Sequence, residues 1–164
     1  MRTHTRIDSP LGTLTLVATD GALSGVYLEG HRFMPDPAGF GPRVDRGFEQ
    51  AAEQLGEYFA GRRREFTLRT LPSGSDFQRR VWRALASIPY GQTWSYARLA
   101  EAVGRPDAVR AVAAANASNP LSVVVPCHRV VGSDGSLVGY AGGLARKRFL
   151  LELERGGGRQ GALF

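Results

Sequence analysis

The segment LSVVVPCHRVVGSDG, residues 121–135, contains the only cysteine of the chain, Cys127, with His128 directly after it. The aliphatic run before the cysteine predicts a short buried strand over residues 121–125. Pro126 ends this strand because proline cannot donate to a β ladder. A free cysteine is more often a small buried hydrophobic residue than a nucleophile. Here the adjacent histidine and arginine and the aliphatic surroundings favour a reactive thiol in a dry pocket.

The chain has to turn before Cys127 and His128 can share a site, because adjacent residues of a strand point to opposite faces. We expect this turn at Pro126. A second turn, of the hairpin type, is predicted at GSDG, residues 132–135. The glycine-rich segment that follows places Tyr140 in a corner where backbone amides can approach a planar ligand. A glycine pair is by itself only a weak signal.

A histidine that acts as a base also needs a carboxylate to orient it. The last predicted helix, ARKRFLLELE at residues 145–154, offers Glu152 and Glu154. Glu154 is next to the inward face of this helix, at a place where a glutamate is more often solvated. The helical periodicity predicts that the inward side chains are Phe149, Leu150 and Leu153.

Upstream of the cysteine, the sequence predicts two short helices joined by a tight glycine-containing turn, the pattern of a helix-turn-helix. They follow a longer helix that Ser75 or Asp76 can cap. The first short helix is capped by Ser95 and ends at Gly104, and the second has Pro106 in its first turn, where a helix tolerates proline. The apolar faces are Phe77, Val81, Trp82, Leu85 and Ile88 in the longer helix, and Leu99, Ala100 and Val103 in the first short one.

The second short helix, AVRAVAAAN at residues 108–116, is unusual for a helix that reads DNA bases. Base-reading helices carry Asn, Gln or Arg toward the major groove. Here nearly all side chains are small and apolar, and Arg110 is the long exception. One explanation is a well-packed core helix. The other is a smooth helix that approaches a DNA minor groove closely, with one arginine projecting and little dependence on sequence.

The first half of the chain predicts antiparallel β structure at its start. Turn signals occur at PLG, after Ser9, and at Asp20–Gly21. Alternating apolar residues between them predict strands over residues 3–9, 13–18 and 22–28.

A loop over residues 30–44 is predicted to lead into a helix that starts near Phe48 and is closed by Gly61. EFTLRTL, residues 65–71, alternates and predicts a returning strand. LPSGS, residues 71–75, is the expected linker and domain boundary.

The composition describes a soluble, folded, cytoplasmic protein. Of 164 residues, 43% are hydrophobic and 22% are charged. No apolar run reaches the about 20 residues that a membrane span needs, and the N-terminus lacks an apolar signal core. One cysteine and three histidines without ligand spacing predict no structural zinc or other metal.

The net charge of +6 is concentrated in the second half of the chain. Residues 1–72 contain nine arginines and nine acidic residues, whereas residues 73–164 contain twelve basic and six acidic ones. A basic half favours contact with a polyanion, because lysine and arginine displace counterions from phosphates. Arginine also commonly solvates a surface, so charge alone favours nucleic acid only slightly. Lys147 is the single lysine of the chain.

NPLSVVVPCHRVVGSDGSLVGYAGGLARKRFLLELE, residues 119–154, closely resembles the active-site region of the O6-alkylguanine-DNA alkyltransferases, or methylated-DNA–protein-cysteine methyltransferases. FQRRVWRALASIPYGQTWSYARLA and RPDAVRAVAAANASNP, residues 77–100 and 105–120, resemble the same family. Together these segments cover nearly all of residues 75–155, and the combination of Asn-Pro, PCHR and Tyr-x-Gly-Gly is highly specific. The first half resembles the family only through its length and β-rich start.

The resemblance implies an α/β (α+β) fold in two domains. Residues 1–72 would form a β-rich domain of antiparallel sheet plus helix, of ribonuclease H-like type. Residues 75–158 would form a winged helix-turn-helix domain that binds DNA and carries the alkyl acceptor. There is no sign of a separate phosphotriester-repair or regulatory domain.

The same resemblance implies roles for the reacting residues. Cys127 accepts the alkyl group, His128 activates it through a water molecule, and Glu154 orients the histidine. Asn119 supports the turn between the helix-turn-helix and the cysteine. Tyr96 helps to rotate the target nucleotide and donates a hydrogen bond to the guanine.

Further roles concern the lesion and the DNA. Arg110 fills the gap that the rotated nucleotide leaves, and Ala111 and Ser133 contact the DNA. The carbonyls of Cys127 and Val130 accept from the exocyclic amine of guanine, and the Ala141 amide meets its O6. The remaining pocket residues are Tyr140, which forms a wall, and Asn116, at an edge where family members vary.

The function implied is direct, irreversible and stoichiometric transfer of an alkyl group from O6-alkylguanine, and also O4-alkylthymine, to Cys127. A thioether is stable, so each molecule acts once. The partner is double-stranded DNA, entered through the minor groove after base flipping. No cofactor, metal or membrane is implied. We expect a monomer, with cooperative binding on DNA as an open alternative.

Three other functions compete with this interpretation. Relatives of the same fold that bind the lesion without transfer lack the cysteine, which this chain has at Cys127. A winged-helix regulator would need polar base-reading residues on the alanine-rich helix. A cysteine hydrolase would turn over repeatedly on a thioester or an amide.

Overall fold

The computed structural model describes residues 1–32 and 34–157. The sheet of the first half consists of strands β1 (Arg2–Ile7), β2 (Leu14–Thr19) and β3 (Ala22–Leu28), antiparallel and in that order. The three predicted strands are therefore confirmed. Asp20 and Gly21 both have positive φ, 51° and 82°, as the tight turn between two twisted strands requires.

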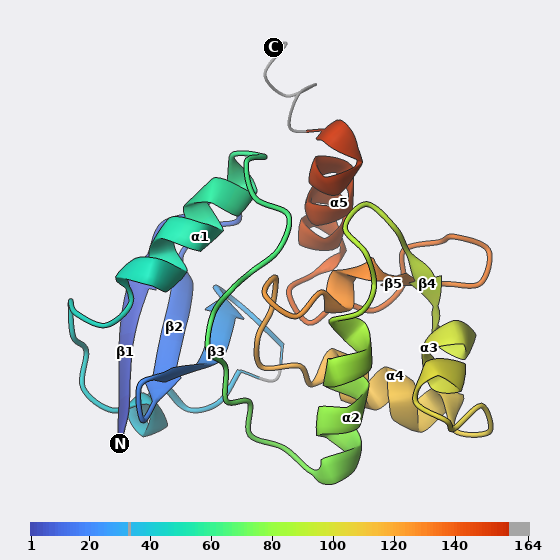
Figure 1. Ribbon diagram of the computed structural model, residues 1–164, viewed down its shortest axis with the longest axis horizontal. Coiled ribbons are helices and arrows are strands. Elements are labelled where there is room, and N and C mark those ends of the chain that lie inside the picture. The colour runs from blue at the N-terminus through green and yellow to red at the C-terminus, as the bar shows by residue number, and fades with distance from the viewer. Residues whose placement is uncertain (33, 158–164) are drawn as a thin grey trace.

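Helix α1 (Glu49–Phe59) packs on this sheet, as Figure 1 shows, with Leu55 and Tyr58 fully buried. Gly61 ends it with a φ of 77°, as predicted. The loop before α1 contains one short 3₁₀ turn, η1 (Pro37–Phe40). The core of this half is completed from the second half by four residues: Leu121, Val123, Leu150 and Leu153.

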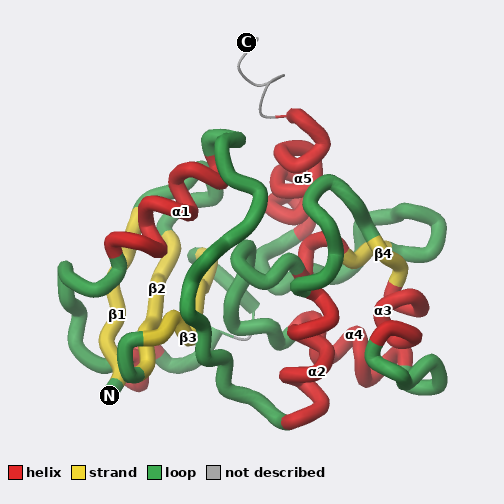
Figure 2. The backbone as a smooth tube through the Cα atoms, in the orientation of Figure 1, coloured by secondary structure: helices red, strands yellow, loops and turns green. Residues whose placement is uncertain are grey.

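The strand predicted over residues 65–71 is wrong. This segment runs as a loop between the two halves in Figure 2. It meets β3 at a single point, where the Leu23 amide donates to the Arg69 carbonyl at 2.9 Å and the Leu71 amide donates to the Leu23 carbonyl at 2.8 Å. One bridged residue does not make a ladder, so the alternating pattern reflects a segment that is half covered on one side rather than a strand.

The helix-turn-helix is confirmed as helices α2 (Asp76–Leu85), α3 (Tyr96–Ala102) and α4 (Val109–Ala117), which pack on one another. Ser75 and Ser95 cap α2 and α3. The Trp82 indole of α2 donates to the Ala115 carbonyl of α4 at 2.8 Å. The expectation that Pro106 lies in the first turn of α4 is wrong. Residues 105–108 close a separate turn, with the Ala108 amide on the Arg105 carbonyl at 2.9 Å.

The rest of the chain is arranged around the cysteine. Strand β4 (Trp94–Ser95) pairs in parallel with β5 (Val130–Val131), which follows the 3₁₀ turn η2 (Cys127–Arg129). Helix α5 (Leu144–Glu152) continues into a wider turn, η3 (Leu153–Gly157). Within residues 1–32 and 34–157, no helix is both long enough and apolar enough to cross a membrane.

The buried strand predicted over residues 121–125 is also wrong. Only Leu121 bridges to β3, and residues 122–125 form turns, with Val123 in the left-handed region at a φ of 72°. Asn119 explains this shape: its Oδ1 accepts from the Leu121 amide at 3.0 Å and its Nδ2 donates to the Val125 carbonyl at 2.9 Å. Val123 lies four residues before Cys127 in the chain, and a β-branched residue in the left-handed region is typical of a functional site.

Candidate active site

Cys127 begins the 3₁₀ turn η2 and is buried, with 5% of its surface exposed. The predicted turn at Pro126 is present, because the Arg129 amide donates to the Pro126 carbonyl at 3.0 Å. Burial raises the pKa of the Cys127 thiol, while a hydrogen bond from Asn119 and the charge of Lys147 lower it. Burial is the largest of these effects, so the resting thiol is neutral.

His128 and Glu154 form a buried hydrogen-bonded pair. The Nε2 atom of His128 lies 2.7 Å from Oε2 of Glu154, and both side chains are buried. Burial alone would raise the pKa of Glu154, but the hydrogen bonds and charges of His128 and Arg129 outweigh it and lower this pKa to about 2. Glu154 is therefore a carboxylate at neutral pH, and it accepts hydrogen bonds without donating any.

The state of Glu154 determines the tautomer of His128. A carboxylate can only accept, so Nε2 must carry the hydrogen. Burial lowers the pKa of His128, Glu154 opposes this effect, and the charges of Arg129 and Lys147 lower the pKa further. The net shift is downward, so the ring is neutral at neutral pH. The lone pair is then on Nδ1, which is buried and has no hydrogen-bond partner among the described residues. Nδ1 is the atom available to take a proton.

Arg129 fixes the carboxylate from the other side. Its Nε donates to Oε1 of Glu154 at 2.7 Å, and its NH2 group donates to Oε2 at 3.0 Å. Its NH1 group donates to the Ile88 carbonyl at 2.6 Å. Two nearly parallel bonds from a planar guanidinium hold a carboxylate in one orientation. The sequence placed Arg129 near the thiol, whereas its main contact is with Glu154.

Lys147 is a site residue that pattern reasoning missed. Its side chain is fully buried, and its ammonium donates to the carbonyls of Val130, Val138 and Gly139 at 2.5, 2.8 and 3.1 Å. Burial lowers its pKa to about 8, and the nearby Cys127 opposes this. One feature of the sequence could have pointed to this residue: Lys147 is the only lysine of the chain, and the other twenty Lys or Arg positions are all arginine.

The inward face predicted for the last helix needs correction, because the buried Lys147 belongs to it. Phe149 is 37% exposed, and the residues that face inward on α5 are Lys147, Leu150 and Leu151. A hydrophobicity pattern assigns charged residues to the surface, so it rotated the helix away from its true buried face. Leu150 and Leu153 are buried as predicted.

Three further predicted residues surround Cys127. Tyr96, Tyr140 and Val130 belong to the same apolar cluster as the cysteine. The Tyr96 hydroxyl donates to the Val138 carbonyl at 3.1 Å, which ties α3 to the glycine-rich corner. The Ala141 carbonyl of that corner accepts from the Arg32 amide at 2.7 Å. Asn116 is buried on α4, and its Oδ1 has no partner in the described part of the chain.

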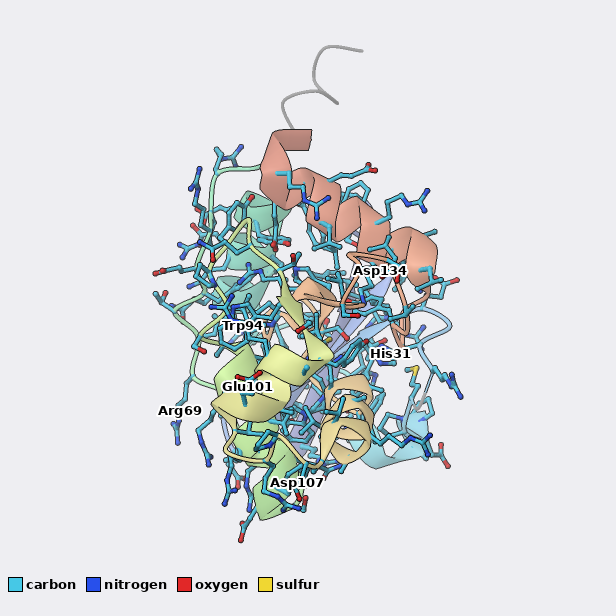
Figure 3. All side chains as sticks on the ribbon, turned by 90° about the vertical axis from the view of Figure 1, so that its right-hand side faces the viewer. His31, Arg69, Trp94, Glu101, Asp107 and Asp134 are labelled. Carbon is cyan, nitrogen blue, oxygen red and sulfur yellow. The ribbon has the colours of Figure 1, made fainter. Side chains whose placement is uncertain are left out.

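The residues predicted to contact DNA lie on the surface, whereas the thiol is buried. Helix α4 buries Val112, Ala115 and Asn116 and exposes Arg110 and Ala111. Ser133 is exposed in the turn after β5. Figure 3 shows this side of the molecule, with Asp107 in the turn between α3 and α4 and Asp134 in the turn after β5. Among the described residues, His, Cys, Asp and Glu side chains form no group of three that could hold a metal ion.

Comparisons with known proteins agree with this geometry. Residues 76–156 match the family model of the 6-O-methylguanine DNA methyltransferase DNA binding domain, and residues 3–72 match the ribonuclease-like domain of the same methyltransferase. The chain is 51% identical over 149 residues to the methylated-DNA–protein-cysteine methyltransferase of Mycolicibacterium paratuberculosis, covering 91% of this chain and 90% of the relative.

Solved structures show the same fold. The structure of Mycobacterium tuberculosis OGT in complex with DNA has a TM-score of 0.88 at 46% identity, covering 94% of this chain and 93% of that chain. The Mycobacterium tuberculosis O6-methylguanine methyltransferase has a TM-score of 0.87 at 45% identity, covering 95% and 94%. The chain belongs to the 6-O-methylguanine DNA methyltransferase family.

Proposed function

We propose that the protein repairs O6-alkylguanine in DNA by transferring the alkyl group to the sulfur of Cys127, as a methylated-DNA–protein-cysteine methyltransferase. The observation that carries this proposal is the buried His128–Glu154 pair, whose histidine directly follows the thiol in the chain. Glu154 is held as a carboxylate, His128 donates to it through Nε2, and the Nδ1 lone pair is left without a partner among the described residues. O4-alkylthymine is a second substrate.

The reaction moves one alkyl group and one proton. Nδ1 of His128 takes the thiol proton, directly or through water, and the resulting imidazolium is stabilised by Glu154. The sulfur then attacks the alkyl carbon, and the bond between that carbon and O6 breaks. Guanine leaves with the electron pair and regains a proton that the imidazolium returns through solvent. The thioether does not hydrolyse, so each molecule acts once and no cofactor is needed.

We propose a lesion pocket against the sulfur of Cys127, among the residues of the apolar cluster that Tyr96, Tyr140 and Val130 share with it. We assign the carbonyls of Cys127 and Val130 to the exocyclic amine of guanine and the Ala141 amide to O6. The aromatic ring of Tyr140 forms a wall, and Asn116 borders the pocket from α4. Tyr96 donates to the guanine once its hydroxyl turns away from the Val138 carbonyl that it meets in the structure. Asn119 acts indirectly, because it holds the turn that presents the thiol.

Chemistry on a stacked base requires that the nucleotide leave the duplex, at a cost of a few kcal/mol. We assign α4 to the minor groove, because its exposed residues are small apart from Arg110, which is long enough to replace the rotated nucleotide. Ala111 then approaches the groove, and Ser133 contacts the backbone from the neighbouring turn. The partner is double-stranded DNA, bound by a monomer in the cytoplasm.

Intact mass measurement tests this proposal. The protein is mixed with an equimolar duplex that contains one O6-methylguanine. We expect one added methyl group per protein, located at Cys127 by peptide analysis, and none on a Cys127→Ala variant. Binding of the duplex without any gain in mass would favour a lesion-binding protein instead. Repeated turnover on excess duplex would contradict the single-use mechanism.

A further inference from the structure

Glu154 has one partner that belongs to neither the active-site segment nor its helix. The hydroxyl of Tyr58, on α1 of the first half, lies 2.5 Å from Oε2 of Glu154, a contact between residues 96 positions apart. Tyr58 is fully buried. The first half of the chain therefore touches the reactive centre through a hydrogen bond, in addition to its apolar packing.

The direction of this hydrogen bond follows from charge. Burial and the negative charge of Glu154 raise the pKa of Tyr58 well above its ordinary value, so the phenol stays protonated. A protonated phenol donates and a carboxylate accepts. Oε2 of Glu154 then accepts from three groups, Tyr58, His128 and Arg129, while the bond to Oε1 comes from Arg129.

The Tyr58 ring is held so that its hydroxyl cannot easily turn away. Its centroid lies 5.4 Å from those of Phe59 and Phe66 and 6.3 Å from that of Tyr90. The Arg129 guanidinium lies 5.6 Å from the Tyr90 centroid. Tyr90 therefore contacts both Tyr58 and Arg129, two of the residues that donate to Glu154. A Phe side chain at position 58 would keep this packing and remove only the hydroxyl.

We propose that Tyr58 is a positioning residue for alkyl transfer, acting through Glu154 on the basicity of His128. This inference rests on the proposed role of His128 as the base. The Tyr58 hydroxyl shares the oxygen to which His128 donates, and it withdraws negative charge from that oxygen. It also restricts rotation of the carboxylate. By this route the sheet-containing half of the protein tunes a reaction whose acceptor lies in the other half.

The consequence of removing the hydroxyl has a defined sign. Without Tyr58 as a donor, more of the Glu154 charge acts on His128, which stabilises the imidazolium and raises the pKa of His128. Alkyl transfer requires the neutral ring, so the pH below which the rate falls should move upward. The looser carboxylate should also lower the rate on the pH plateau.

The test compares Tyr58→Phe with the matched variant Tyr27→Phe. Tyr27 is also a buried tyrosine of the first half, and its ring stacks on Phe40 at 5.5 Å, away from the thiol. Single-turnover rates are measured over a range of acid to mildly basic pH on a duplex containing O6-methylguanine. For Tyr58→Phe we expect a plateau about tenfold lower, as for loss of one hydrogen bond to a charged group. The acid limb should move up by about half a pH unit.

Tyr27→Phe should leave both the plateau and the acid limb unchanged. A loss of folding alone would reduce the active fraction of Tyr58→Phe without moving its acid limb. If Tyr58→Phe does not fold, site-specific replacement of Tyr58 by 3-fluorotyrosine keeps the ring and makes the hydroxyl a stronger donor. The acid limb should then move downward. An acid limb at the wild-type pH in every folded variant would overturn the proposal.

A His128→Ala variant separates this proposal from the proposed function. Wild-type transfer by His128→Ala would refute the role of His128 as the base, whatever Tyr58 does. Slow transfer by His128→Ala together with a wild-type profile for Tyr58→Phe would refute the role of Tyr58 alone.

Discussion

Helices α4 and α5 are both nine residues long. Apolar side chains are usually buried and charged ones exposed, and each helix departs from one half of this rule. Helix α4 presents Val109 and Ala111 to solvent, whereas α5 buries Lys147 completely. The exposed apolar surface of α4 coincides with its proposed approach to DNA, and the buried charge of α5 joins the carbonyls of Val130, Val138 and Gly139. The comparison teaches that departures from amphipathic patterning are places to look for function, although α5 also exposes Leu144 and Phe149, to which no function is assigned.

The largest effect is expected on the α5 side, for Lys147→Met. Methionine fills a similar volume but leaves the carbonyls of Val130, Val138 and Gly139 without their donor. We expect the free energy of unfolding to fall by about 4 kcal/mol, measured by urea denaturation. Arg148→Met, on the exposed side of the same helix, should change it by less than about 0.5 kcal/mol. Equal losses in the two variants would show that the ammonium contacts add nothing.

The next effect concerns Glu154, which follows α5 closely. Glu154→Gln replaces a carboxylate by a neutral amide, so it no longer stabilises the imidazolium of His128. We expect the single-turnover rate of alkyl transfer to fall about a hundredfold, the lower end of a general-base contribution. Circular dichroism should show a folded variant. A rate within about twofold of the wild type would remove Glu154 from the mechanism.

The charge of Glu154 also predicts acid lability. Its pKa is about 2 in the folded protein, against an ordinary value of 4.5 that applies once the chain unfolds. The folded pKa is the lower one, so the stabilisation is present above pH 4.5 and is lost as the pH falls toward 2. Between about pH 6 and about pH 3 the wild type should lose about 2 kcal/mol more stability than Glu154→Gln. Parallel pH dependence in urea denaturation of the two proteins would contradict this.

The smallest effect is expected on the α4 side, for Arg110→Ala. Arg110 is exposed on α4. We expect repair of duplex DNA to slow about tenfold, because the gap left by the flipped nucleotide is no longer filled. Reaction with O6-methylguanine as the free base should proceed at the wild-type rate. Equal slowing on both substrates would mean that Arg110 supports the pocket and not the DNA.

Local patterns in the sequence were sufficient for most of the elements. Ser75 and Ser95 are caps in the structure, Gly61 ends its helix, and Asp20–Gly21 makes the tight turn. Each of these signals acts over a few residues, through backbone conformation or a side-chain hydrogen bond to the backbone. The predicted strands at 65–71 and 121–125 failed because a strand exists only with a partner in register. Each segment meets its neighbour at only one bridged residue.

The chain by itself determined the residue types for the chemistry: one cysteine, the histidine after it and a glutamate on the last helix. The resemblance carried by residues 119–154 was specific enough to assign them roles. Only the tertiary structure decided that His128 donates through Nε2, that Lys147 is buried, and that Tyr58 reaches Glu154 from the other half. These facts depend on contacts between residues far apart in the chain. Periodicity and motifs describe local preferences, and the free energy of burying a charge depends on partners that only folding brings together.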